Sequence, residues 1–83
     1  MKKHELKIMP EYFQTILSGE KTFEVRFNDR NFAKGDHLLL REHDGEGYTG
    51  RTLTAEVTYL LDNPNYCKEG YVIMAIKVLD DVK

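Results

Sequence analysis

The sequence predicts an α+β domain that is mainly β, with about five strands curled into a small barrel and one main helix between strands 1 and 2. Five stretches alternate apolar and polar residues, whereas one stretch places apolar residues at helical spacing. The chain has 83 residues, which is the size of a single domain (1–83) with a small core. Curling so many strands into a barrel removes sheet edges that would otherwise pair with neighbouring molecules.

The N-terminal part is expected to form a short strand and then a short helix. Leu6-Lys7-Ile8 alternates, and Pro10 suits the first helical turn, where its missing N–H would have no partner. One apolar stripe follows at positions i, i+3 and i+4, made of Phe13, Ile16 and Leu17. So short a helix needs packing against the sheet to be stable. Tyr12 lies off this stripe, and we expect it to face a groove.

The stretch from Ser18 to Arg26 is expected to lead from the end of the helix directly into the second strand. Gly19 supplies the left-handed conformation that commonly ends a helix. From there the residues alternate, so one face of the strand is apolar and the other polar. We expect the core to receive Phe23, Val25 and Phe27. The opposite face then carries Thr22, Glu24 and Arg26.

Three further strands are expected, at residues 37–43, 52–61 and 71–79. A polar break precedes them, and there Asn28 or Asp29 is expected to cap a short helical turn. Turns are predicted at residues 33–36, 44–47 and 62–65, and the tail 80–83 is expected to fray. The inward residues are predicted to be Leu38, Leu40, Leu53, Ala55, Val57, Tyr59, Leu61, Val72, Met74, Ile76 and Val78.

Composition excludes several classes of protein. The formal net charge of −2 argues against a protein that coats nucleic acid through bulk positive charge. The single cysteine, Cys67, cannot form an internal disulfide, which fits a reducing cytoplasm. No apolar run approaches the roughly 20 residues of a membrane span, and the N-terminus lacks the apolar stretch of a signal peptide. We therefore expect a cytoplasmic protein without a membrane partner.

No metal site and no cofactor are expected. The histidines and Cys67 lack the spacing of metal ligands such as Cys-x-x-Cys. The glycines at positions 45, 47 and 50 fit the needs of turns and do not form a phosphate-binding loop.

Five ionisable residues within ten positions form the first candidate site: Lys21, Glu24, Arg26, Asp29 and Arg30. One interpretation is a network of salt bridges on an ordinary solvated strand, which contributes little stability. The other is a binding site, in which Lys21 and one arginine hold an anion or the edge of a base.

A second candidate patch surrounds the predicted hairpin loop and consists of His37, Arg41, His43, Tyr48 and Arg51. Arg41 and Arg51 lie on either side of the loop, so the hairpin is expected to bring them together. An aromatic ring with nearby arginines is typical of single-stranded RNA binding. The alternative is a solvated hairpin whose arginine stems cover apolar surface.

The motif Gly19-x-Lys21-Thr22-x-Glu24-x-Arg26 resembles the signature of ASCH domains, which are relatives of the PUA RNA-binding fold. The rest of the chain is similar to short ASCH-like proteins of bacteria and phages. The other matching segments span nearly the whole chain and are residues 4–8, 10–13, 24–30, 35–36, 48–51 and 70–74. The resemblance implies a PUA-like barrel that binds RNA or a nucleotide-like molecule.

The ligand is expected in a cleft between the helix end and the second strand. There Lys21, Arg26 and Thr22 would contact it, and Glu24 would accept a hydrogen bond from an exocyclic amine. Tyr12 or Tyr48 would stack on a base. The wall of the cleft would be held by Asp29 and Arg30.

Some small ASCH proteins are amidohydrolases that remove the acetyl group of N4-acetylcytidine, using a lysine and a threonine nucleophile. Here Lys21 matches, but Glu24 stands at the position of that threonine. A carboxylate attacks an amide poorly, Thr22 is displaced by two residues, and Glu69 is only a possible later acid. A hydrolase in which Lys21 and Glu24 are the catalytic candidates, with Glu24 as general base on water, is the alternative. A non-catalytic interaction module is a third.

Overall fold

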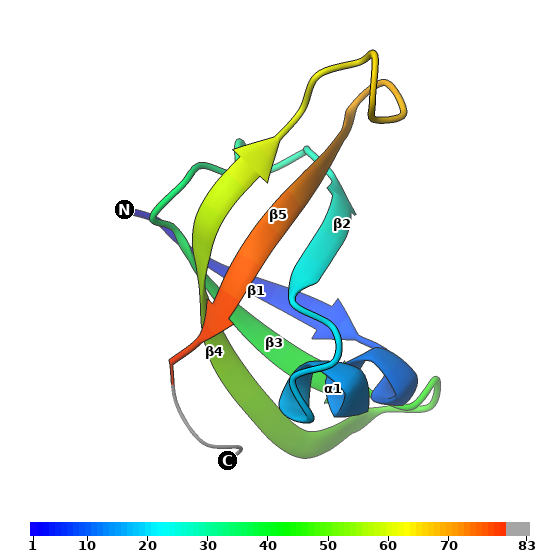
Figure 1. Ribbon diagram of the computed structural model, residues 1–83. Helices are drawn as coiled ribbons and strands as arrows, with labels where there is room; N and C mark the ends of the chain where they lie inside the picture. Colours follow the sequence, from blue (N-terminus) through cyan, green and yellow to red (C-terminus); the bar gives the residue numbers. More distant parts are fainter. Residues whose placement is uncertain (80–83) are drawn as a thin grey trace.

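The computed structural model describes residues 1–79, so the predicted fraying of residues 80–83 lies outside the described range. The fold is mainly β, with five strands in one curled sheet and a single helix (Figure 1). The number of strands and the place of the helix between the first two strands are confirmed. The elements are β1 (Lys3–Ile8), α1 (Pro10–Leu17), β2 (Phe23–Phe27), β3 (His37–His43), β4 (Tyr48–Leu61) and β5 (Tyr71–Val78).

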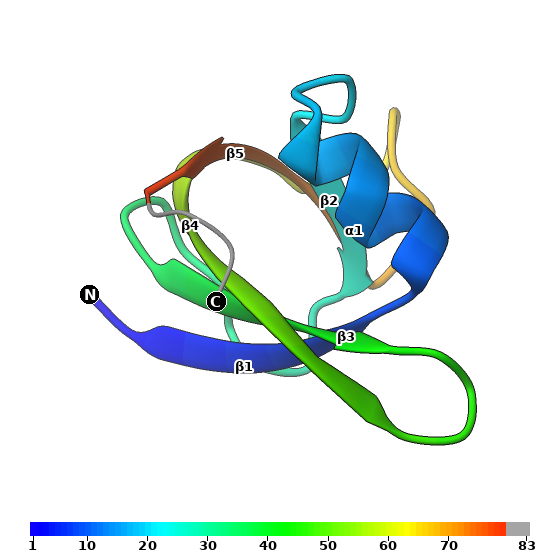
Figure 2. The ribbon, with the colours of Figure 1, turned by 90° about the horizontal axis from the view of Figure 1, so that it is seen from below.

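The sheet has the order β1-β3-β4-β5-β2. β1 pairs with β3 in parallel, and the other three pairs are antiparallel. Figure 2 shows that the sheet curls into an open half-barrel with α1 beside β2. Within residues 1–79, β1 pairs only with β3 and β2 only with β5. The barrel is therefore not closed by a strand ladder, and the outer edges of β1 and β2 leave a gap.

The core fills the hollow of the curled sheet and is capped by α1. Phe13 and Ile16 are buried as predicted, whereas Leu17 is 41% exposed because it lies past the edge of the stripe. Pro10 is the first helical residue. The buried apolar residues are Leu6, Ile8, Phe13, Ile16, Phe32, Leu38, Leu40, Leu53, Ala55, Val57, Val72, Met74 and Ile76. Val78, predicted to point inward, is 38% exposed at the end of β5.

The orientation predicted for β2 is wrong. Phe23, Val25 and Phe27 are 45%, 50% and 55% exposed, whereas Glu24 is only 3% exposed. The alternation is as expected, but the two faces are exchanged. The physical reason is that the inner face of β2 borders the gap beside β1, where Lys21 and Arg26 neutralise the buried carboxylate of Glu24. A buried charge is tolerated where it is paired and hydrogen-bonded.

A β-bulge explains the error at the end of β4. The pairing with β5 shifts between Val57 and Tyr59, so Thr58 is the extra residue. Beyond it the two faces are exchanged: Tyr59, predicted to lie in the core, is 61% exposed, and Leu60 packs against the core instead. Leu61, also predicted inward, is partly exposed.

The connections follow the predicted turns, with one exception. Residues 28–31 form no helical turn. Instead the side-chain oxygen of Asn28 accepts a hydrogen bond from the Phe32 amide, which holds the loop in place. Gly35 has a φ of 93°, as a tight turn with a left-handed residue requires. Among residues 1–79 no helix combines the length and the apolar character needed to cross a bilayer.

Candidate functional site

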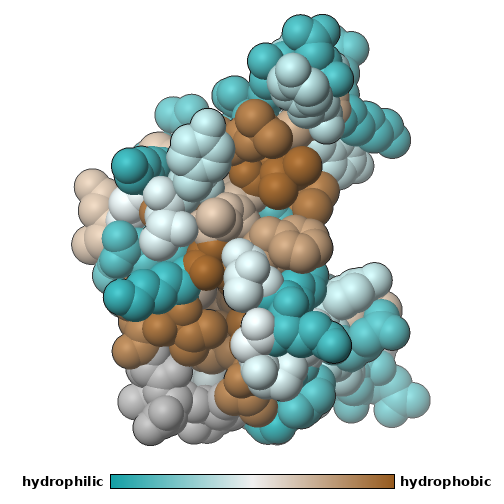
Figure 3. Space-filling model, in the orientation of Figure 1, coloured by the Kyte–Doolittle hydropathy of each residue, from teal (hydrophilic) through white to brown (hydrophobic). Residues whose placement is uncertain are grey.

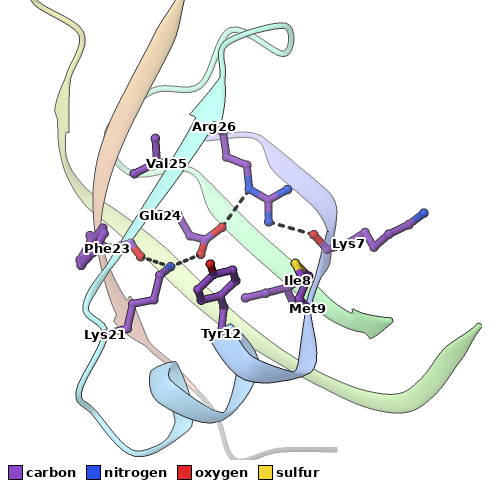
Figure 4. Close-up of a pocket in the computed structure, with 9 residues that line it drawn as sticks. All are labelled: Lys7, Ile8, Met9, Tyr12, Lys21, Phe23, Glu24, Val25 and Arg26. Atoms are coloured by element: carbon purple, nitrogen blue, oxygen red, sulfur yellow. Dashed lines mark hydrogen bonds and ion pairs between the residues drawn. The ribbon is translucent and has the colours of Figure 1, made fainter. Parts of the chain in front are cut away.

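A pocket of about 550 Å³ lies at the gap between the unpaired edges of β1 and β2 (Figure 4). The helix α1 forms its floor, and the residues between α1 and β2 form one side. The lining residues are Lys7, Ile8, Met9, Tyr12, Lys21, Phe23, Glu24, Val25 and Arg26. This volume lies within the range of about 300–1,000 Å³ that is usual for small-molecule sites.

The carboxylate of Glu24 is the centre of the pocket wall. Its Oε1 atom lies 2.5 Å from Lys21 Nζ, and its Oε2 atom lies 2.9 Å from Arg26 Nε. The Glu24 side chain is 4% exposed, against 16% for Lys21 and 25% for Arg26. A network of salt bridges was one interpretation of this cluster, and the structure shows both of these ion pairs.

The position of Lys21 follows from the way the helix ends. Gly19 adopts a φ of 84°, which turns the chain away from the helix axis. The Lys21 amide then donates to the Thr15 carbonyl oxygen, so the backbone of Lys21 is held against α1. Its ammonium also donates to the Phe23 carbonyl oxygen at 2.6 Å. The side chain therefore reaches from the helix end over the edge of β2 into the pocket.

Two arginines bridge the gap between the edges of the sheet. Arg26 Nη2 donates to the carbonyl oxygen of Lys7 at 2.9 Å, and Arg30 Nη1 donates to the carbonyl oxygen of Glu5 at 2.6 Å. Both acceptors belong to the outer edge of β1. Side chains thus make the connection that a strand ladder would make in a closed barrel.

Two aromatic rings flank the ammonium of Lys21. Its Nζ atom lies 5.5 Å from the centre of the Tyr12 ring and 4.9 Å from that of Phe23. Both distances fall within the range of cation–π attraction. Tyr12 is 43% exposed and lines the pocket, so it faces a groove as expected.

The remaining members of the predicted cluster lie outside this pocket. Thr22 is exposed and lines a different depression, beside Ile76 and Val78. Asp29 pairs loosely with Arg30, at 3.8 Å, on the surface. Ile8 and Met9 also line the pocket, although the sequence pattern did not predict this. Only the sheet order brings the end of β1 opposite β2.

The second predicted patch is divided between the two faces of the sheet. The Arg41 guanidinium lies 3.8 Å from the centre of the Tyr48 ring, and the rings of His43 and Tyr48 meet edge to face. Arg51, by contrast, points to the other face, where its Nε and Nη2 atoms each lie 3.0 Å from an oxygen of buried Glu42. The prediction that Arg41 and Arg51 come together is wrong, because they have opposite parity across the hairpin. His37 is on the outer face of β3.

Glu42 is a buried carboxylate that the sequence analysis missed. Hydrogen bonds from Arg51 and from the Thr49 hydroxyl outweigh the effect of burial and lower the pKa of Glu42. The same contact raises the pKa of Arg51. The guanidinium of Arg51 also lies 4.5 Å from the centre of the Phe13 ring, so this pair supports the core and does not belong to an open site.

Among residues 1–79, no group of three or more histidine, cysteine, aspartate or glutamate side chains is placed to hold a metal ion. Cys67 is buried, and its Sγ atom lies 3.3 Å from the Leu61 carbonyl oxygen.

The sequence of residues 3–76 matches a known family of protein domains. A family model described as "Domain of unknown function (DUF3850)" matches residues 3–76, which include every residue of the pocket. The chain belongs to this family. It is similar to the "Uncharacterized 12.9 kDa protein in GpA 3'region" of Escherichia phage P2, with 38% identity over 73 residues. The alignment covers 88% of this chain but 66% of the phage protein, so the chain spans just under two thirds of that relative.

In this DUF3850 domain the pocket combines apolar walls with a few converging polar groups, as in ligand sites generally. Lys21 and Arg26 are cationic and Glu24 is anionic, whereas the Lys7 side chain points away from the pocket (Figure 4). Two positive charges against one negative charge leave a local charge of +1, although the whole chain carries −2. The pocket thus combines a small excess of positive charge with apolar and aromatic side chains.

Proposed function

We propose that the pocket binds one nucleotide unit, supplied by single-stranded RNA or by a free nucleotide. The observation that carries this proposal is the buried Glu24 carboxylate, held between Lys21 and Arg26 in a pocket that also exposes aromatic rings. A planar base, an anionic phosphate and hydrogen-bonding edges are the three features that such a pocket complements.

The base would lie against the exposed ring of Tyr12, since stacking on an aromatic side chain is the usual way to hold an unpaired base. Glu24 accepts hydrogen bonds, so it would receive an exocyclic amine. The Lys21 ammonium would donate to a base carbonyl or to a phosphate. Lys7, exposed at the rim, adds positive charge where the backbone of an RNA strand would leave the pocket.

The resemblance to ASCH domains supports the same proposal, because those domains are related to an RNA-binding fold. The shared residues Gly19, Lys21 and Arg26 occupy the pocket or place its side chains. We extend the proposal to the fold: the half-barrel is a PUA-like barrel, and the protein acts in the cytoplasm. The hairpin pair Arg41 and Tyr48 would make additional contacts to a longer strand.

The test is a binding titration with short fluorescent single-stranded RNAs, measured by anisotropy at two salt concentrations. The wild type should bind, with an affinity that falls as salt rises. Lys21→Ala should weaken binding about tenfold, whereas Lys34→Ala removes the same charge from an exposed turn and should leave binding nearly unchanged. Tyr12→Ala should also weaken binding, and Tyr66→Ala, at a 75% exposed loop residue, is its control.

A second arm uses mononucleotides, measured by calorimetry. Binding of mononucleotides with the same dependence on Lys21 would identify a nucleotide site, and binding of RNA alone would identify a strand-binding site. An absence of salt-sensitive binding in both arms would overturn the proposal.

A hydrolase that acts on an acylated nucleoside is the second candidate. The observation in its favour is that the Lys21 ammonium and the Glu24 carboxylate touch in the pocket wall. Against it, both carboxylate oxygens are already bound by cations, and Thr22 lies outside the pocket. Release of acetate from N4-acetylcytidine, lost in Lys21→Ala and Glu24→Gln, would support it. No turnover across a panel of acylated nucleosides would exclude it.

If neither binding nor turnover is found, the non-catalytic module is the proposal that fits. Simultaneous neutralisation of Lys21, Glu24 and Arg26 would then change only the stability of the fold.

A further inference from the structure

The outer face of the sheet is divided into a polar half and an apolar half. On β3 and the first part of β4 the outward residues are mostly polar or charged, for example His37, Arg41 and Glu56. On β2, β5 and the end of β4 they are apolar. The apolar face, as we call it, consists of Phe23, Val25, Phe27, Tyr59, Leu61, Tyr71, Ile73 and Ala75.

The strand register shows that these eight residues form one continuous surface. Phe23 and Tyr59 both lie opposite Ala75, on its two sides, and make a first row across three strands. Val25 and Leu61 flank Ile73 in the same way and make a second row. Phe27 lies opposite Tyr71, and their rings meet edge to face at 5.5 Å. Figure 3 shows apolar side chains gathered on this side of the molecule.

The β-bulge at Thr58 completes this surface. If Thr58 were paired regularly and not bulged, Tyr59 and Leu61 would point into the core, and the face would consist of two strands only. Four of these large apolar or aromatic side chains are each about half exposed to solvent. Phe23, Val25, Phe27 and Tyr59 are 45%, 50%, 55% and 61% exposed. A contiguous exposed apolar patch of this kind marks an interaction surface.

We infer that the apolar face is the interface of a homodimer, in which two copies pack this face against each other around a twofold axis. The exposed area of the apolar face is large enough for such an interface. At about 150–250 Å² for a whole aromatic side chain, the eight residues offer roughly 500 Å² per copy. Two copies then bury roughly 1,000 Å², which reaches the lower limit for a specific interface.

The geometry of the face suits a second copy. Two sheets that pack face to face lie about 10 Å apart, as in β-sandwiches. A twofold interface uses the same patch twice, so an apolar patch without unpaired charges at its centre complements itself. At the border, Glu56 and Lys77 lie opposite each other and separate the apolar face from the polar half.

The dimer would also affect the pocket, although the inference does not depend on the proposed function. Phe23 belongs both to the apolar face and to the lining of the pocket. A second copy on the apolar face would therefore shield the outer side of the Phe23 ring, beside which the Lys21 ammonium lies.

The experiment is sedimentation equilibrium of the wild type over a concentration series from about 1 to 500 µM. The expected result is a rise of the mean mass from 9.7 kDa towards twice that value. Tyr59→Lys should raise the dimer dissociation constant at least about tenfold, and Val25→Lys should do the same. Leu39→Lys is the matched control, because Leu39 is an outward residue of β3 outside the apolar face, and it should change the constant less than about threefold.

Circular dichroism establishes that each variant is folded, and the wild-type series stands even if a variant is not. A wild type that keeps a mass of 9.7 kDa over the whole series would overturn the inference. Equal weakening by Leu39→Lys and Tyr59→Lys would overturn it as well, because the dimer would then use another surface.

Discussion

Arg26 donates a hydrogen bond of 2.9 Å to the main-chain carbonyl oxygen of Lys7, which lies 19 residues away on a strand that does not pair with its own. The same guanidinium donates through Nε to buried Glu24. One side chain thus neutralises the charge in the pocket wall and joins the two free edges of the sheet. The pocket and the closure of the barrel depend on the same residue.

Replacing Arg26 should therefore destabilise the protein more than replacing its neighbour Arg30. Arg26→Ala leaves the buried Glu24 oxygen and the Lys7 carbonyl without these donors, and we expect a loss of about 2 kcal/mol in the free energy of unfolding. Arg30 also reaches β1 but is 45% exposed, so Arg30→Ala should cost about 0.5 kcal/mol. Urea denaturation measures both values, and equal losses would contradict the bridging role of Arg26.

Because the two faces of β2 are exchanged, truncating Val25 of β2 should cost much less stability than truncating the buried Val72 of β5. Val72 of β5 is 0% exposed, and Val72→Ala should cost about 2 kcal/mol because it leaves a cavity in the core. Val25 of β2 is 50% exposed, and Val25→Ala should cost about 0.5 kcal/mol or less. The measurement is chemical denaturation at low protein concentration. A larger cost at Val25 than at Val72 would mean that β2 packs in the orientation expected from its sequence.

The two arginines of the hairpin should differ as well. Arg51→Ala removes both hydrogen bonds that its guanidinium makes to buried Glu42, and should lower the urea midpoint clearly. Arg41→Ala removes a surface pair with Glu5, and the midpoint should hardly change. The effects of Arg51→Ala and Glu42→Gln on stability should not be additive, because the two residues bind each other. Additive effects would show that the two residues act separately.

Glu42 should also contribute to acid sensitivity. Its pKa is lowered from the ordinary 4.5 in the folded state, so its contribution to stability is fully present above pH 4.5 and is lost as the pH falls through the folded pKa. The gap in urea midpoint between the wild type and Glu42→Gln should therefore shrink on going from pH 7 to pH 3. Glu69→Gln, at an exposed loop residue, is the control and should show no such gap. A gap that stays constant over this range would contradict the assignment.

Asp36 should act in the same direction. Burial alone would raise its pKa, but hydrogen bonds from the Lys2 amide, the His4 ring and the Ala33 amide together lower it. These contacts tie the N-terminus to the turn before β3. Their contribution is present above the ordinary pKa of 3.8 and is lost below it as the carboxylate is protonated.

Much of the fold could be predicted from the sequence, because strands and helices are local patterns. The alternation of Leu38 and Leu40, the spacing of Phe13 and Ile16, and the glycine after the helix each specify their element without reference to the rest of the chain. A pocket does lie beside the helix end and β2, where the sequence predicted a cleft. The contact between Lys21 and Glu24 follows from the short path between the helix end and β2.

The rest depends on relationships that no local pattern contains. Burial of the apolar residues of β2 was the reasonable expectation from hydrophobicity alone. It failed because the inner face of this edge strand meets Lys21 and Arg26 instead of a covering element, so the buried group is a carboxylate. The parallel pairing of β1 with β3, which brings Met9 into the pocket, joins segments 34 residues apart, and no periodic pattern indicates it.

The extra residue in β4 means that the pairing register, and not hydrophobicity, decides which side chains meet solvent at that end of the sheet. A chain without Thr58 would keep Tyr59 on the outer face, because Tyr59 would then directly follow the inward Val57 and still lie opposite Ala75. If Thr58 were instead paired regularly with β5, Tyr59 and Leu61 would both turn inward, and an aromatic ring would be forced into a core that is already full.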